Sequence, residues 1–78
     1  METFKEGDFF YFKKDDKMVR VIGVILGETK DFYRCKILAS SQPQLVNNHK
    51  FFSKTGNIMK YCEKIFESDV RYGYIPDL

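Results

Sequence analysis

The chain has 78 residues, of which 44% are hydrophobic and 17% aromatic, and its 13 basic and 11 acidic residues give a formal charge of +2. This length predicts a single domain, 1–78, with a small core to which large aromatic side chains contribute much buried area. The nearly balanced charge lacks the cation excess of a typical nucleic-acid-binding domain, and no apolar run approaches the roughly 20 residues of a membrane span.

The first residues, 1–6, lack the apolar segment of a signal peptide, so we expect a cytoplasmic protein that does not associate with membranes. Cys35 and Cys62 match no zinc or redox spacing. In the cytoplasm we expect both thiols to be reduced and packed as small hydrophobes. His49 is the only histidine, and we expect neither a metal nor a cofactor.

The first predicted strand covers residues 7–12. Its aromatic side chains fall on both faces, with Phe9 and Tyr11 on one and Phe10 and Phe12 on the other. A strand with two apolar faces is either enclosed in a barrel or exposes rings on one side. The sequence leaves open which face is buried.

A polar hairpin turn at 13–17 precedes a long second strand, 18–28, which is rich in β-branched residues. Gly23 lies in its middle, where a glycine predicts a bulge or a sharp bend. Small barrels turn corners in this way. The polar segment 27–31 predicts the next turn.

The third strand, 32–38, alternates clearly. Its inward set is apolar: Tyr33, Cys35 and Ile37. Arg34 and Lys36 fall on the other face, which we expect to meet water or a ligand. A polar segment, 39–48, follows and is long for a connection in so small a domain, so we expect it to be functional. Residues 49–53 predict a short strand.

Two interpretations of the next segment compete. In one, 54–57 is a hairpin turn and 58–66 is a strand. In the other, Asn57 caps a helix over about 57–67, whose apolar residues form one stripe. Periodicity favours the helix, whereas the turn chemistry and the β-rich context favour the hairpin. A tight turn at 67–70 then leads to a last strand, 71–75, which in a small barrel would pair with the first.

This order of elements resembles the SH3-like small barrels, including the Tudor and KOW types and many short proteins of bacteria and phages. The resemblance is carried by four segments: 7–8, 21–25, 33–37 and 66–70. It implies a mainly β fold class, an SH3-like small barrel or rolled sheet, with a helix at about 57–67 as a departure from the pattern. Related barrels bind peptides, proteins or nucleic acid, and few are enzymes.

The helical interpretation is also similar to the ribonuclease toxins of toxin–antitoxin pairs, which open a barrel strand after Gly-Asp and end in a helix. This chain is shorter and lacks their early Arg-Pro segment. Its acidic residues lie in predicted turns or on polar faces, and no nucleophile stands beside a base. We therefore expect no catalytic residues, and a toxin-like ribonuclease is the third hypothesis for function.

The first hypothesis is a non-enzymatic module, regulatory or inhibitory and of phage or bacterial type, that binds a protein partner. Rings of Phe10 and Phe12, exposed on one face, would dock that partner or a second copy in a homodimer.

The alternative is nucleic-acid binding by a basic and aromatic face. Arg34 and Lys36 would share that face with side chains of the next strand: Lys50, Phe52 and Lys54. Rings stack on bases while cations meet phosphate. In the opposing interpretation, Phe52 belongs to the core and the lysines extend past it to water.

Overall fold

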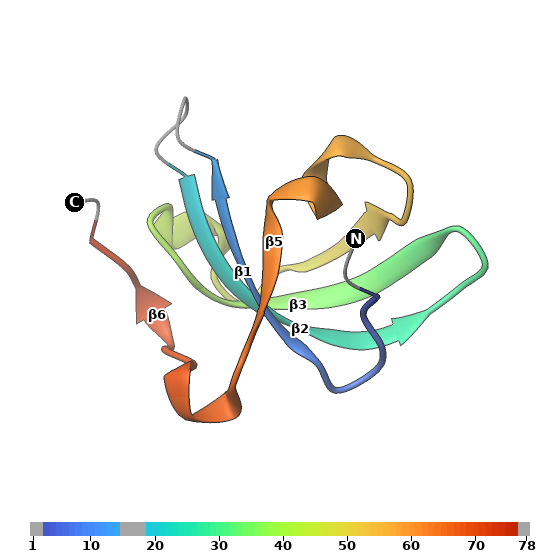
Figure 1. Ribbon diagram of the computed structural model, residues 1–78. Coiled ribbons are helices and arrows are strands. Elements are labelled where there is room, and N and C mark those ends of the chain that lie inside the picture. Colours follow the sequence, from blue (N-terminus) through green and yellow to red (C-terminus); the bar gives the residue numbers. More distant parts are fainter. Residues whose placement is uncertain (1–2, 15–18, 77–78) are drawn as a thin grey trace.

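The computed structural model describes residues 3–14 and 19–76 and consists of one six-stranded sheet (Figure 1). The strands are β1 (Phe9–Lys14), β2 (Val19–Glu28), β3 (Phe32–Ser40), β4 (His49–Ser53), β5 (Cys62–Ile65) and β6 (Gly73–Tyr74). Among the described residues, three short 3-10 turns connect strands: η2 (Pro43–Leu45), η3 (Asn57–Tyr61) and η4 (Glu67–Asp69). The described residues contain no α-helix, so the mainly β class is confirmed.

The strands follow the order β4-β3-β2-β1-β5, with antiparallel pairing throughout. The sheet rolls strongly, but in the described residues β4 and β5 do not pair, so the barrel is not closed (Figure 1). The strand beside β1 is β5, which corrects the prediction that 71–75 would take this place. Instead β6 pairs in parallel with β3, through Ala39 with Gly73 and Ser40 with Tyr74.

The segment after β4 follows neither prediction as a whole. Its first part forms η3, which ends when the Cys62 N–H bonds to the Met59 carbonyl and the backbone becomes extended. Cys62 then pairs with Phe12 at the start of the β1–β5 ladder. An α-helix over 57–67 would leave this edge of β1 without a partner, whereas the observed path fills the ladder and buries both Met59 and Cys62. The predicted hairpin with β4 is also absent.

The bend in β2 is confirmed at Gly23. The register between β2 and β3 shifts between Ile22 and Gly23, and again between Ile25 and Gly27. A Cβ atom at Gly23 would lie 2.5 Å from Cζ of Phe10 and 2.9 Å from the carbonyl oxygen of Lys36. The sheet can roll this tightly because no side chain stands between the Phe10 ring and the β3 backbone.

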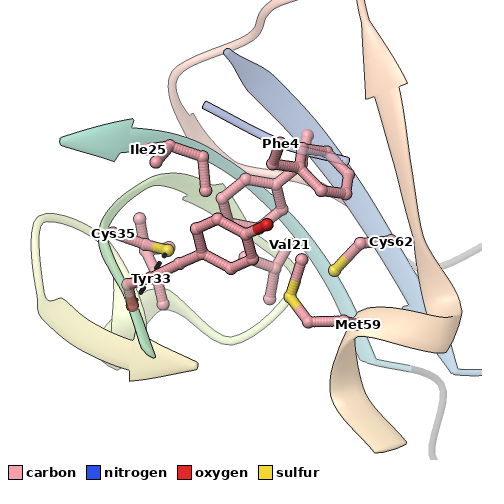
Figure 2. Packing of buried hydrophobic residues seen from close by; sticks show 9 residues of the cluster. Phe4, Val21, Ile25, Tyr33, Cys35, Met59 and Cys62 are labelled. Atoms are coloured by element: carbon pink, nitrogen blue, oxygen red, sulfur yellow. Dashed lines mark hydrogen bonds between the residues drawn. The ribbon is translucent and has the colours of Figure 1, made fainter. Parts of the chain in front are cut away.

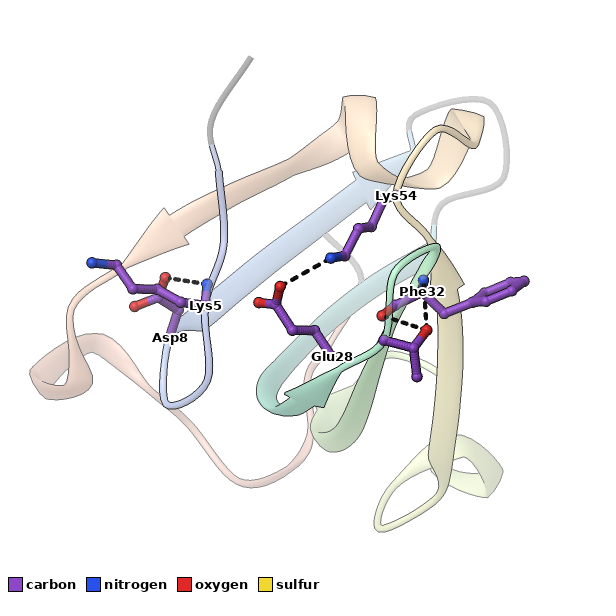
Figure 3. A network of polar contacts seen from close by, with 6 residues as sticks. Lys5, Asp8, Glu28, Phe32 and Lys54 are labelled. Atoms are coloured by element: carbon purple, nitrogen blue, oxygen red, sulfur yellow. Dashed lines mark hydrogen bonds and ion pairs between the residues drawn. The ribbon is translucent and has the colours of Figure 1, made fainter.

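The core fills the inside of the roll (Figure 2). Four rings contact one another edge to face, with centroid distances of 6.4 Å for Phe4–Phe10, 6.1 Å for Phe4–Tyr33 and 5.8 Å for Phe10–Phe52. Phe4 precedes the first strand, where no periodic pattern predicts that its side chain is buried. A tight turn brings it back, in which Gly7 has a φ of 91° and the Lys5 N–H bonds to Oδ2 of Asp8 at 2.9 Å (Figure 3).

We expect Gly23→Ala to lower the free energy of unfolding by about 1–3 kcal/mol, because the added methyl group overlaps the Phe10 ring and the β3 backbone. Urea denaturation measures this change. Gly27→Ala in the same strand is the matched control, since its Cβ would lie 3.5 Å from the nearest atom, Nη2 of Arg34. Equal losses in the two variants would contradict the close packing at Gly23.

Candidate interaction surface

The face of β1 that carries Phe10 and Phe12 points into the roll. Phe10 is 0% exposed, and Phe12 is half-buried against the core with its ring 6.2 Å from that of Tyr61. The predicted docking surface of exposed rings is therefore corrected. The reason is the bend at Gly23, which folds β2 and β3 over this face and leaves Phe9 and Tyr11 on the outside.

The register of β3 with β4 separates the predicted basic and aromatic residues onto two faces. Arg34 lies opposite Phe51, whereas Cys35 lies opposite Lys50 and Tyr33 opposite Phe52. Because residues directly opposite each other share a face, Lys50 and Phe52 lie on the inward side. Arg34 and Lys36 lie outside, as predicted, but without these two partners.

Lys54 is not available as a free cation, because it forms an ion pair with Glu28. Its Nζ lies 2.9 Å from Oε1 of Glu28 (Figure 3). The same atom lies 5.1 Å from the centroid of the Tyr33 ring. Its backbone N–H bonds to the Asp31 carbonyl at 2.9 Å, which extends the ladder between the two strands. Lys54 therefore closes one end of the roll.

A different set of side chains shares the outside of these strands: Phe32, Arg34, Lys36, His49 and Phe51. We call this set the β3–β4 outer face. Phe51 is 64% exposed and Phe32 is 45% exposed. Sequence reasoning missed Phe51 because it assigned the ring of Phe52 to the outside. Phe51 and Phe52 are consecutive in a strand, so their rings lie on opposite faces. Only the register with β3 decides which of the two rings lies outside.

An apolar groove of about 340 Å³ lies beside β4, at the open side of the roll. Residues of β1, β2, β3, β4, η2 and η3 line this groove. The apolar side chains among them include Phe12, Val19, Leu45, Phe52 and Ile58. Lys50 is the one charged residue among the described residues that line it, and Phe51 stands where the groove meets the outer face. We call this cavity the β4 groove.

The predicted functional loop, 39–48, contributes to this groove. Ala39 and Ser40 belong to β3, and the rest of the segment folds back onto the sheet through η2. The Asn47 N–H bonds to the Ile37 carbonyl, and the Ile37 N–H bonds to the Asn48 carbonyl. These bonds hold Leu45 against the core, so the loop forms a wall of the groove.

A second apolar cavity, of about 330 Å³, lies on the other side of the molecule, between the outer side of β1–β2 and the chain after β5. Ile22 and Ile75 contribute to its lining, and Nη1 of Arg20 bonds to the Tyr11 hydroxyl at 3.2 Å. Arg71 and Asp69 both stand at this cavity, so it carries charges of both signs.

Cys35 and Cys62 are free and buried, as predicted. Burial raises the pKa of the Cys35 thiol to about 11, and burial together with the neighbouring Cys35 raises the pKa of Cys62 to about 12. Such thiols stay protonated near neutral pH and are poor nucleophiles. In the described ranges, no group of three or more His, Cys, Asp and Glu side chains could hold a metal ion.

The raised thiol pKa values predict a loss of stability at high pH. Above the ordinary pKa of 9.0, thiols ionise in the unfolded chain while the folded protein keeps them protonated, so the unfolded state gains by up to about 1.4 kcal/mol per pH unit for each thiol. Urea denaturation at pH 8, 9 and 10 should show wild type losing more stability than the Cys35→Ala, Cys62→Ala double variant. A constant difference between the two proteins would contradict this origin.

No helix in residues 3–14 and 19–76 has the length and hydropathy needed to cross a membrane. Comparison of the chain with protein-family models, with curated proteins and with solved structures found no match in any of the three.

Proposed function

We propose that this chain is a non-enzymatic, cytoplasmic binding module of SH3-like small-barrel type that engages a protein partner through the β3–β4 outer face and the β4 groove. The architecture is supported by the strand order β4-β3-β2-β1-β5, by the long second strand bent at Gly23 and by the short turn η3 before β5. These features match the strand, kinked long strand, strand, loop, strand and turn of that family, although the rolled sheet stays open.

The observation that carries the proposal is the position of Phe51. Its ring is 64% exposed on a strand at the end of the sheet, at the border between a cationic face and an apolar groove. Burial of a Phe side chain yields about 1.5–3 kcal/mol, which a partner would gain on covering this ring. Aromatic residues and Arg are enriched at protein interfaces, and both occur here with Arg34 directly opposite Phe51.

Photo-crosslinking tests this role. A photoreactive phenylalanine at position 51 should crosslink to a defined protein in extracts of the native host. The matched control carries it at position 66, where Phe66 is 79% exposed but follows β5 at the opposite edge of the sheet. We expect the crosslink at position 51 alone. An excess of unlabelled wild-type chain should suppress this crosslink, whereas an excess of the unlabelled Phe51→Asp variant should not. Equal crosslinking from both positions would contradict a specific surface at Phe51.

Nucleic-acid binding is a second candidate, favoured by one feature of the register. Arg34 and Lys36 share the outer face with the exposed rings of Phe32 and Phe51, so cations and stacking surfaces alternate within one patch. Neither cation forms an ion pair with another described residue. This patch differs from the predicted one, which also included Lys50, Phe52 and Lys54.

Titration of a labelled single-stranded oligonucleotide at several salt concentrations tests this candidate. Wild type should bind with an affinity that falls as salt rises, because phosphate contacts release counterions. The Arg34→Glu, Lys36→Glu variant should lose this binding, while Lys30→Glu, in the turn before β3, should retain it. Binding that does not respond to salt, or no binding by wild type, would remove nucleic acid as the partner.

A further inference from the structure

The free edge of β4 offers a second kind of contact, one made by the backbone. Resting on the protein-binding role proposed above, we propose that β4 accepts an extended segment of the partner as an added strand. The segment alternates apolar with acidic side chains. It would dock its backbone on β4, place apolar groups in the β4 groove and meet the cations around it.

The hydrogen-bond pattern determines which backbone groups are free. β4 is the last strand in the sheet order and pairs only with β3 among the described residues. At its two ends the Ile37 N–H bonds to the Asn48 carbonyl and the Lys54 N–H bonds to the Asp31 carbonyl. Because hydrogen-bonded pairs alternate along an antiparallel ladder, the N–H and C=O groups of His49 and Phe51 point away from β3. These groups give an added strand two donors and two acceptors.

The side chains of an added strand would reach two different surfaces, since successive residues of a strand point to opposite faces. One set would lie on the outer side, beside the exposed ring of Phe51. The other set would lie over the β4 groove, next to Phe52 and Leu45. This groove has the volume and the apolar lining of a typical ligand pocket, of which the lower limit is about 300 Å³. Main-chain bonds would supply affinity, and the groove would select apolar side chains.

The charges around β4 specify an acidic partner. Lys50 is the one charged group that the described lining of the groove contains, and Arg34 and Lys36 lie on the outer face. None of the three forms an ion pair with another described residue. Lys54 differs, because Glu28 already neutralises it at 2.9 Å. Complementary charge favours the binding of carboxylates here and disfavours a basic segment.

The same charges argue against a second copy as the occupant. Two β4 strands paired edge to edge would bring two copies of Lys50 together, and β4 itself contains no acidic residue. Like charges placed across an interface oppose association. A partner of different composition therefore fits this edge better than another copy of the chain.

The probe for the test is a synthetic ten-residue peptide, blocked at both ends, in which valine or leucine alternates with glutamate. Calorimetry measures its affinity for the full chain, and NMR reports which backbone amides become protected from exchange. We expect the amides of His49 and Phe51 to gain protection, and the affinity to fall as salt rises. Three control peptides have lysine for glutamate, the same residues in scrambled order, or N-methyl groups on alternate residues.

N-methylation removes backbone donors and keeps the side chains, so it should weaken binding by about tenfold or more, the loss expected for removing main-chain bonds worth about 1.4 kcal/mol. Lys36→Glu, on the outer face that the acidic side chains of the peptide would meet, should weaken binding of the glutamate peptide and strengthen binding of the lysine peptide, whereas Lys30→Glu should change neither. The Lys36 side chain lies on the outer face and is not part of the core, so this exchange leaves the core intact.

No binding by the glutamate peptide, or binding that N-methylation leaves unchanged, would overturn the added-strand proposal. Self-association of the free chain in sedimentation, abolished by Phe51→Asp, would overturn it in favour of a second copy. The two proposals fail separately. A crosslink from position 51 together with a peptide that does not bind would leave the protein-binding role standing, while edge binding without any crosslink would leave the peptide site without a cellular partner.

Discussion

The packing of the Phe10 ring against the backbone at Gly23 is the contact on which the rest of the structure depends. It allows β2 to bend and bring β3 across the inner face of β1. A Cβ atom at Gly23 would lie 2.5 Å from the ring and 2.9 Å from the Lys36 carbonyl oxygen, so only glycine fits here without a shift of its neighbours. The bend turns a flat sheet, with aromatic residues on both sides, into a roll with an inside. Phe4 packs edge to face against Phe10, and Tyr33 packs in the same way against Phe4.

The surface follows from this choice of inside. Once Phe10 points inward, the pairing of the strands determines which alternate residues of β2 and β3 point inward as well. The register shifts twice, where Leu26 and Leu38 have no partner on the opposite strand. The register with β4 then places Phe51 and Arg34 outside and Lys50 at the groove. A small core therefore determines which cations and rings lie on the surface.

Much of the fold could be predicted from the sequence, because its signals are local. The first three strands, the bend at Gly23 and the short strand 49–53 each depend on alternation, β-branched residues or a glycine, and all appear in the structure. The predicted helix over 57–67 was wrong. Pairing with the edge of β1 outweighs the helical periodicity of this segment, and no residue within the segment indicates that this edge needs a partner.

The candidate surface could be predicted only in part, and for a related reason. Arg34 and Lys36 lie outside as expected, since the alternation of their own strand is clear. Phe10 and Phe52 lie inward because the bend and the β3–β4 register decide their side, and both are long-range properties. The burial of Phe4 depends on a turn at Gly7 that brings a residue from outside the strands into the core.

The parallel pairing of β6 with β3 has a consequence for the behaviour of the protein at high concentration. β6 covers the stretch of β3 that β4 leaves bare, and the Ile75 N–H bonds to the Ser40 carbonyl to hold it there. The strands left at the ends of the sheet are then short, five residues in β4 and four in β5, and both carry lysine. Short, charged edges are features by which natural sheets avoid pairing edge to edge with other chains, and both ends of this sheet have them.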